Sequence, residues 1–173
     1  GLTQIVDPVI GDPRYRSVNV LADNISSIVD LSTLTTFQDL DNSIWDTNYP
    51  GYSSFTAKAG GSILVPLLTS MNAARVTIDG TGNLPISQFT ALTNSVINVT
   101  GAGVIASFPV LANIDGASLL VSGGAVLSLP SVTAIKMPNH VATSLLTAIG
   151  TNSLLDLRNV QSLTQREDRF SRI

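Results

Sequence analysis

The chain has 173 residues, of which 44% are hydrophobic and only 5% aromatic, and it carries a net charge of −3 with a pI near 4.8. This acidic balance leaves no basic stripe, which argues against nucleic acid as a partner. No apolar run reaches the length of about 18 residues that a transmembrane helix needs. The absence of cysteine fits bacterial exported proteins and is also common in cytosolic ones.

The chain begins with a segment, residues 1–17, that contains Asp7-Pro8 and Asp12-Pro13. Proline in both pairs argues against regular structure, so we expect an N-terminal lead-in or cap that lies over one open end of the fold. Residues 18–37 form a first predicted repeat unit. A long connection, 38–54, then carries Trp45, Tyr49 and Tyr52.

Residues 76–135 contain the clearest repeat, because one apolar pattern occurs nearly three times. Each copy has two alternating apolar residues, a pair of small residues and then further apolar residues, the last of them at steps of three. The copies are Val76, Ile78, Gly80, Gly82, Leu84, Ile86, Phe89, Leu92; Ile97, Val99, Gly101, Gly103, Ile105, Phe108, Leu111, Ile114; and Leu119, Val121, Gly123, Ala125, Leu127, Leu129, Val132, Ile135. A constant period of this length predicts a solenoid.

The repeat extends in both directions from this region. One repeat length toward the N-terminus, apolar residues recur at Phe55, Ala57, Ile63, Val65, Leu68 and Met71. A somewhat longer shift toward the C-terminus finds Ile149, Leu155, Leu157, Val160 and Leu163. In addition, the segment 27–37 matches 153–163 almost position for position. A second long connection, 136–146, carries His140, and residues 164–173 form a polar C-terminal tail or linker.

Residue type and period predict an all-β fold. Alternation indicates strands with one face buried, and a Gly-x-Gly indicates a bend where the chain lacks a Cβ. Frequent Val, Ile and Thr, with Gly or Pro in every unit, disfavour helix. We therefore expect a right-handed parallel β-helix over residues 18–163, with about six coils of 21–22 residues and two corner insertions.

The two insertions are the predicted binding sites, because insertions that collect at one corner of a repeat array often mark its binding face. At about 4.8 Å per coil they would lie on the order of 20 Å apart. Trp45, Tyr49 and Tyr52 could form an aromatic platform for a sugar, although packing on the coil below is favoured. His140 could be a ligand or general base, although it has no nearby acidic partner and a solvated loop position is favoured.

We predict no catalytic residue, metal or cofactor. Calcium could use Asp30 and Asp156, which share one repeat position, or Asp79 and Asp115 beside glycines. These residues do not recur in adjacent coils, so turn and edge positions are favoured. The Gly-x-Gly pairs are not a dinucleotide fingerprint, because no helix follows them.

Segments 114–135 and 153–163 resemble the repeats of large adhesin-like surface proteins of environmental bacteria such as planctomycetes. The resemblance covers most of residues 18–163 and implies export, an extracellular or cell-surface location and a place in a longer chain. It brings no catalytic residue.

The predicted function is a rigid structural or adhesive module of a bacterial cell-surface or secreted protein. It would bind, if at all, through loops 38–54 and 136–146. The candidate partners are a cell-surface glycan, another surface protein, or a second copy at the open coil ends.

Two alternatives remain. A carbohydrate-active β-helix enzyme, a lyase or hydrolase, would need carboxylates that converge, whereas Asp79, Asp115 and Asp156 differ in repeat phase. A trimeric fibre or phage tail component would need an outer apolar stripe, for which the candidates are Leu64, Leu120, Leu146 and Leu154.

Overall fold

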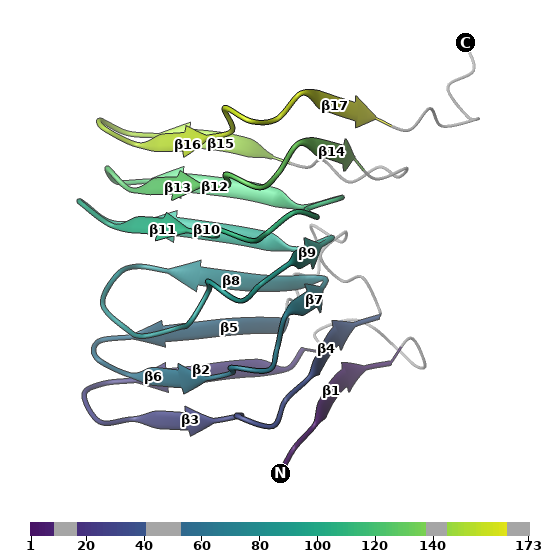
Figure 1. The fold of residues 1–173 in the computed structure, drawn as a ribbon. Helices are drawn as coiled ribbons and strands as arrows, with labels where there is room; N and C mark the ends of the chain where they lie inside the picture. The colour runs from purple at the N-terminus through teal and green to yellow at the C-terminus, as the bar shows by residue number, and fades with distance from the viewer. Residues whose placement is uncertain (9–16, 41–52, 138–144, 166–173) are drawn as a thin grey trace.

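A computed structural model describes residues 1–8, 17–40, 53–137 and 145–165 of the chain. The described residues form short β-strands and no helix (Figure 1). The strands are β1 (Gln4–Asp7), β2 (Asn19–Asp23), β3 (Ile28–Asp30), β4 (Thr36–Asp39), β5 (Ser53–Lys58), β6 (Ser62–Leu64), β7 (Ser70–Asn72), β8 (Ala74–Ile78), β9 (Ala91–Thr93), β10 (Val96–Thr100), β11 (Ile105–Ser107), β12 (Ser118–Ser122), β13 (Val126–Ser128), β14 (Ala134–Met137), β15 (Leu146–Ile149), β16 (Leu154–Asp156) and β17 (Ser162–Gln165). The all-β prediction is confirmed.

Every strand pair among these residues is parallel. The largest sheet has the order β15-β12-β10-β8-β5-β2, so its members are stacked in chain order. We call these strands the first face, and each of them begins one of units one to six. The second face comprises β3, β6, β11, β13 and β16, and the third face comprises β1, β4, β7, β9, β14 and β17.

Within each unit the chain passes from the first face to the second and then to the third (Figure 1). A parallel partner therefore comes from the next unit, about one repeat away in sequence. This topology is compatible with a parallel β-helix. The described residues contain no helical segment with the length and apolarity needed to span a bilayer.

The core lies between the three faces and is built from alternate residues of each strand. On the first face, Phe55 pairs with Val76, Val76 with Ile97, and Ile97 with Leu119, and all four side chains are buried. These pairs confirm the predicted spacing between equivalent positions of successive units. Burial of apolar side chains in these closely packed ladders contributes most of the favourable free energy of folding.

A turn between the second and third faces recurs in every unit. The backbone N–H at its end donates to the carbonyl three residues earlier, in the pairs Leu34 to Leu31, Leu68 to Val65, Phe89 to Ile86, Leu111 to Phe108, Val132 to Leu129 and Val160 to Leu157. Of the apolar residues at steps of three, the first two are the two ends of this turn. The third lies in the segment that follows the turn. A third extended face therefore follows this turn.

The corner between the first and second faces has two lengths. We count the corner from the last inward residue on the first face to the first inward residue on the second face. This step is seven positions in units one, four and six, and six positions in the others. Each long corner has two residues of positive φ, two positions apart, namely Asn24 and Ser26, Gly101 and Gly103, Gly150 and Asn152. Glycine and asparagine tolerate this conformation best.

Two predicted core positions are wrong because of these long corners. Ala106, not Ile105, pairs with inward Leu127, and Ile105 is 73% exposed. Similarly, Val121 pairs with Ala148 rather than with Ile149, which is 63% exposed. In both units the extra corner residue shifts the strand register by one, which moves a side chain to the opposite face of the sheet.

Other predictions need smaller corrections. Leu146 was a candidate for the outer apolar stripe of a trimeric fibre, but it pairs with Leu119 and packs against the core. The expectation of irregular structure before residue 18 is wrong for β1, which adds a strand to β4. The expected connections are also shorter, because β4 and β14 extend into their N-terminal ends. In addition, β5 begins before the end of the first connection and β15 begins at the last residue of the second.

Candidate functional site

The corner between the third and first faces is where the described part of the chain is interrupted. Residues 9–16, 41–52 and 138–144 lie outside the described residues, and each segment joins a third-face strand to the next first-face strand. Both predicted insertions therefore connect the third face to the first face, and residues 9–16 connect the same two faces. Trp45, Tyr49, Tyr52 and His140 all fall in these segments, so their surroundings lie outside the described residues.

Buried polar groups support the corner below the first insertion. Asp39 is fully buried, and its carboxylate accepts a hydrogen bond from the Ser53 backbone N–H at 3.3 Å. The Ser53 hydroxyl in turn accepts from the Val18 N–H at 3.0 Å. Asp7 is also buried and pairs in register with Asp39. Because a buried carboxylate is costly without hydrogen bonds, these contacts hold the strand ends in one arrangement.

The same serine contact recurs along the corner. The Ala74 N–H donates to the Ser95 hydroxyl at 3.2 Å, and the Leu145 N–H donates to the Ser118 hydroxyl at 3.0 Å. Ser53, Ser95 and Ser118 therefore each accept from the backbone of a neighbouring unit. Leu145 is the first described residue after the second insertion, so both insertions are anchored by the same type of hydrogen bond.

Short polar corners separate the two insertions. The Asn94 side-chain amide donates to the Asn72 side chain at 2.9 Å, and the Asn94 backbone N–H donates to the Asp115 carbonyl. The Asp115 carboxylate accepts from the Lys136 N–H at 2.9 Å. These hydrogen bonds connect successive units, so the polar side chains stiffen the corner and set the spacing between the insertions.

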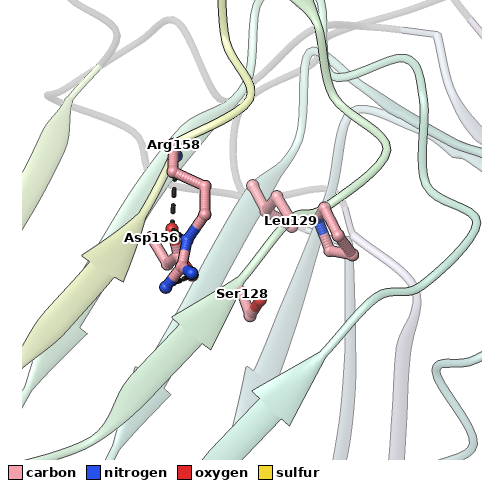
Figure 2. A pocket seen from close by; sticks show the side chains of 5 residues that line it. Ser128, Leu129, Asp156 and Arg158 are labelled. Atoms are coloured by element: carbon pink, nitrogen blue, oxygen red, sulfur yellow. Dashed lines mark hydrogen bonds and ion pairs between the residues drawn. The ribbon is translucent and has the colours of Figure 1, made fainter.

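A second candidate is a recess on the second face, between β13 and β16 (Figure 2). It has a volume of about 280 Å³ and is lined by Ser128, Leu129, Pro130, Asp156 and Arg158. Figure 2 shows the Arg158 side chain folded back over Asp156, from which it is separated by 2.9 Å at two nitrogen–oxygen contacts. The recess therefore combines an ion pair with a hydroxyl and apolar side chains.

Electrostatics limit what this recess can do chemically. Hydrogen bonding from Arg158 lowers the pKa of Asp156, and hydrogen bonding to Asp156 raises the pKa of Arg158. An ionised carboxylate held by a guanidinium is a hydrogen-bond acceptor and a poor general acid. Sequence reasoning treated Asp156 as a turn residue and did not identify its pairing with Arg158, although the Asp-x-Arg spacing after a strand was visible.

The other acidic residues singled out from the sequence are not brought together. Asp79 lies at the corner between the first and second faces, where its carboxylate accepts from Thr81 N–H at 2.8 Å, and Asp115 lies at the corner between the third and first faces. Asp30 and Asp156 take equivalent places in their turns, accepting from the N–H of Ser32 and Arg158 respectively. Within the described residues no group of three or more His, Cys, Asp or Glu side chains could hold a metal ion.

Comparisons of the chain with protein families, with curated proteins and with solved structures all give no match.

Proposed function

We propose that the chain is a right-handed parallel β-helix of about six coils, with about 21–22 residues per uninterrupted coil, a length typical of a solenoid repeat. The parallel register between successive units and the turn that recurs six times in the described residues support this fold. The right hand rests on the strong general preference for right-handed crossovers between parallel strands.

We further propose that this β-helix is a rigid structural or adhesive module of a bacterial cell-surface or secreted protein. The binding role is supported by one observation. All three internal segments outside the described residues connect the third face to the first face, at one corner of the fold. Between that corner in unit two and the same corner in unit six there are four ladder steps, or about 19 Å at 4.8 Å per step. This separation suits contacts with several units of an extended glycan or with one protein surface.

A glycan array tests the adhesive part of the proposal. The variant replaces Trp45, Tyr49 and Tyr52 with alanine, and circular dichroism checks that it is folded. A matched control variant replaces three exposed apolar residues elsewhere, Leu21, Ile25 and Ile149, with alanine. We expect the unmodified protein and the control to bind the same glycans and the aromatic variant to lose binding.

The other outcomes separate the two parts of the proposal. If the folded, unmodified protein binds no glycan, the proposal that the module is a glycan-binding adhesin is contradicted. Only the structural role is then left. If the control loses as much binding as the aromatic variant, the corner segment between β4 and β5 is not the recognition site.

A further inference from the structure

The outward surface of the second face is apolar to an extent that neither of the other faces matches. Ile105, Val126 and Leu154 are stacked in register on β11, β13 and β16, and their side chains point away from the core. Ile105 is 73% exposed and Leu154 is 48% exposed. Six of the exposed large hydrophobic residues lie on this face or in the turns beside it, namely Ile25, Ile28, Leu67, Ile105, Val110 and Leu154.

Charge on this face is confined to its two ends. In units two to five, the second-face strands and the turns that follow them, residues 61–68, 82–89, 104–111 and 125–132, contain no ionisable side chain. Unit one contributes the exposed Asp30, and unit six contributes the pair Asp156 and Arg158. The neutral centre does not suit a charged partner such as a polyanion, whereas a second apolar surface fits it.

The size of the face suits a weak, reversible dimer. Six stacked units span roughly 24 Å at 4.8 Å per ladder step, and the three-residue strands of this face span roughly 10 Å at 3.3 Å per residue. The flat projection of the strands is therefore on the order of 240 Å². The flanking turns, which carry the exposed Ile25, Leu67 and Val110, enlarge this surface. A standard interface buries about 800 Å² from each partner, so this smaller face fits the weak end of the range of specific interfaces.

We propose that two copies of this chain associate through their second faces, with their stacks of strands running in opposite directions. Each copy then places its neutral, apolar centre against the same surface of the other. Identical ladder spacing in both copies allows the rows of side chains to interdigitate over all six units. This association is independent of the binding role of the corner segments.

The opposite direction follows from the charges at the ends. Asp30 and Asp156 take the same place in units one and six, and the Arg158 guanidinium is folded back over Asp156 with its remaining donors exposed (Figure 2). An antiparallel arrangement brings the Asp156–Arg158 pair, which carries no net charge, opposite Asp30 of the other copy, where the remaining guanidinium donors face the Asp30 carboxylate. A parallel arrangement would place each end opposite itself, with Asp30 facing Asp30.

Sedimentation equilibrium over a range of protein concentrations tests the association. We expect a reversible dimer, with twice the chain mass of 18.1 kDa. Replacing Ile105 by aspartate should weaken the dimer on the order of a hundredfold, because an unpaired carboxylate would be buried at its centre. The matched control, Leu21→Asp, changes an exposed residue of the first face and should leave the dimer intact. Unchanged unfolding midpoints verify that both variants are folded.

A monomer at every concentration overturns the proposal, and so does an equal effect of the two aspartate variants. The arrangement is tested separately by thiol cross-linking, since the chain has no native cysteine. Ile28→Cys and Leu154→Cys should be cross-linked by a short bismaleimide when the two variants are mixed, and neither should be cross-linked alone. The antiparallel order is overturned if either variant is cross-linked by itself, or if the mixture of the two variants is not cross-linked.

Discussion

At the scale of single residues, the two glycines of Gly80-x-Gly82 serve different purposes. Gly80 has a φ of +74°, a conformation that glycine adopts without steric cost. Gly82 lacks that conformation, but a Cβ built on it would collide with the Ala57 carbonyl and the Lys58 nitrogen of the preceding unit. The sequence predicted a bend from the pair, yet the close approach depends on the stacking of units and could not be predicted from the spacing alone.

Gly82→Ala should therefore lower the free energy of unfolding by about 1–3 kcal/mol, because the neighbouring atoms belong to backbone and cannot move aside. Urea denaturation measures this change. Gly103→Asn is the matched control, since Gly103 has a φ of +75° with open space around it. Asn152 occupies the equivalent place in unit six, so this control should change stability by less than about 0.5 kcal/mol. An equal cost at both positions would contradict the steric explanation.

At the scale of the elements, sequence spacing predicted the strand register wherever the corners were equal in length. Phe55, Val76 and Ile97 pair as expected because the corners of units two and three have the same number of residues. The prediction failed at Ile105 and Ile149, where a long corner adds one residue. An apolar neighbour stood beside each correct position, so hydrophobicity could not distinguish the two registers.

Ile149 offers a direct test of this register. Its side chain points outward in β15, so Ile149→Ala should change the free energy of unfolding by less than about 0.5 kcal/mol. Leu119→Ala, in the fully buried position of the paired strand, should cost about 2–5 kcal/mol. Thermal or urea unfolding of the two variants gives the comparison. A cost at Ile149 comparable to that at Leu119 would restore the register expected from the sequence.

The candidate sites show the same division between what sequence can and cannot reveal. Chain order alone located the corner from which the insertions leave, because the gap between apolar positions grows there. The recess at Asp156 and Arg158 was missed, since its lining comes from two strands and depends on a turn that folds the arginine back. The neutral second face became visible only once the strands were assigned to faces.

At the scale of the whole molecule, each inner unit is stabilised by contacts with its two neighbours, whereas within the described residues the last unit contacts only the unit before it. Leu155, Leu157 and Val160 take inward positions but are only partly buried, and all four residues of β17 are exposed. In repeat proteins stability is approximately a sum of unit and interface terms, so units at the end of a stack open more easily.

Amide hydrogen exchange should accordingly be slowest in β8 and β10 and fastest in β17. We expect the β17 amides to exchange by roughly tenfold or more faster, which corresponds to about 1.4 kcal/mol of opening free energy. Mass spectrometry of proteolytic peptides resolves these strands. Uniform exchange along the chain would indicate that the units open together as one cooperative body, contrary to this expectation.

The stacking of parallel strands also determines how the molecule responds to force. The first and last described strands, β1 and β17, lie at opposite ends of the stack (Figure 1). Tension between them acts along the inter-strand hydrogen bonds, so the ladders carry the load in series and the weakest one yields first. Tension applied across the strands of one unit would instead shear several backbone hydrogen bonds at once. A module of this build resists bending and sideways load better than it resists being pulled apart from end to end.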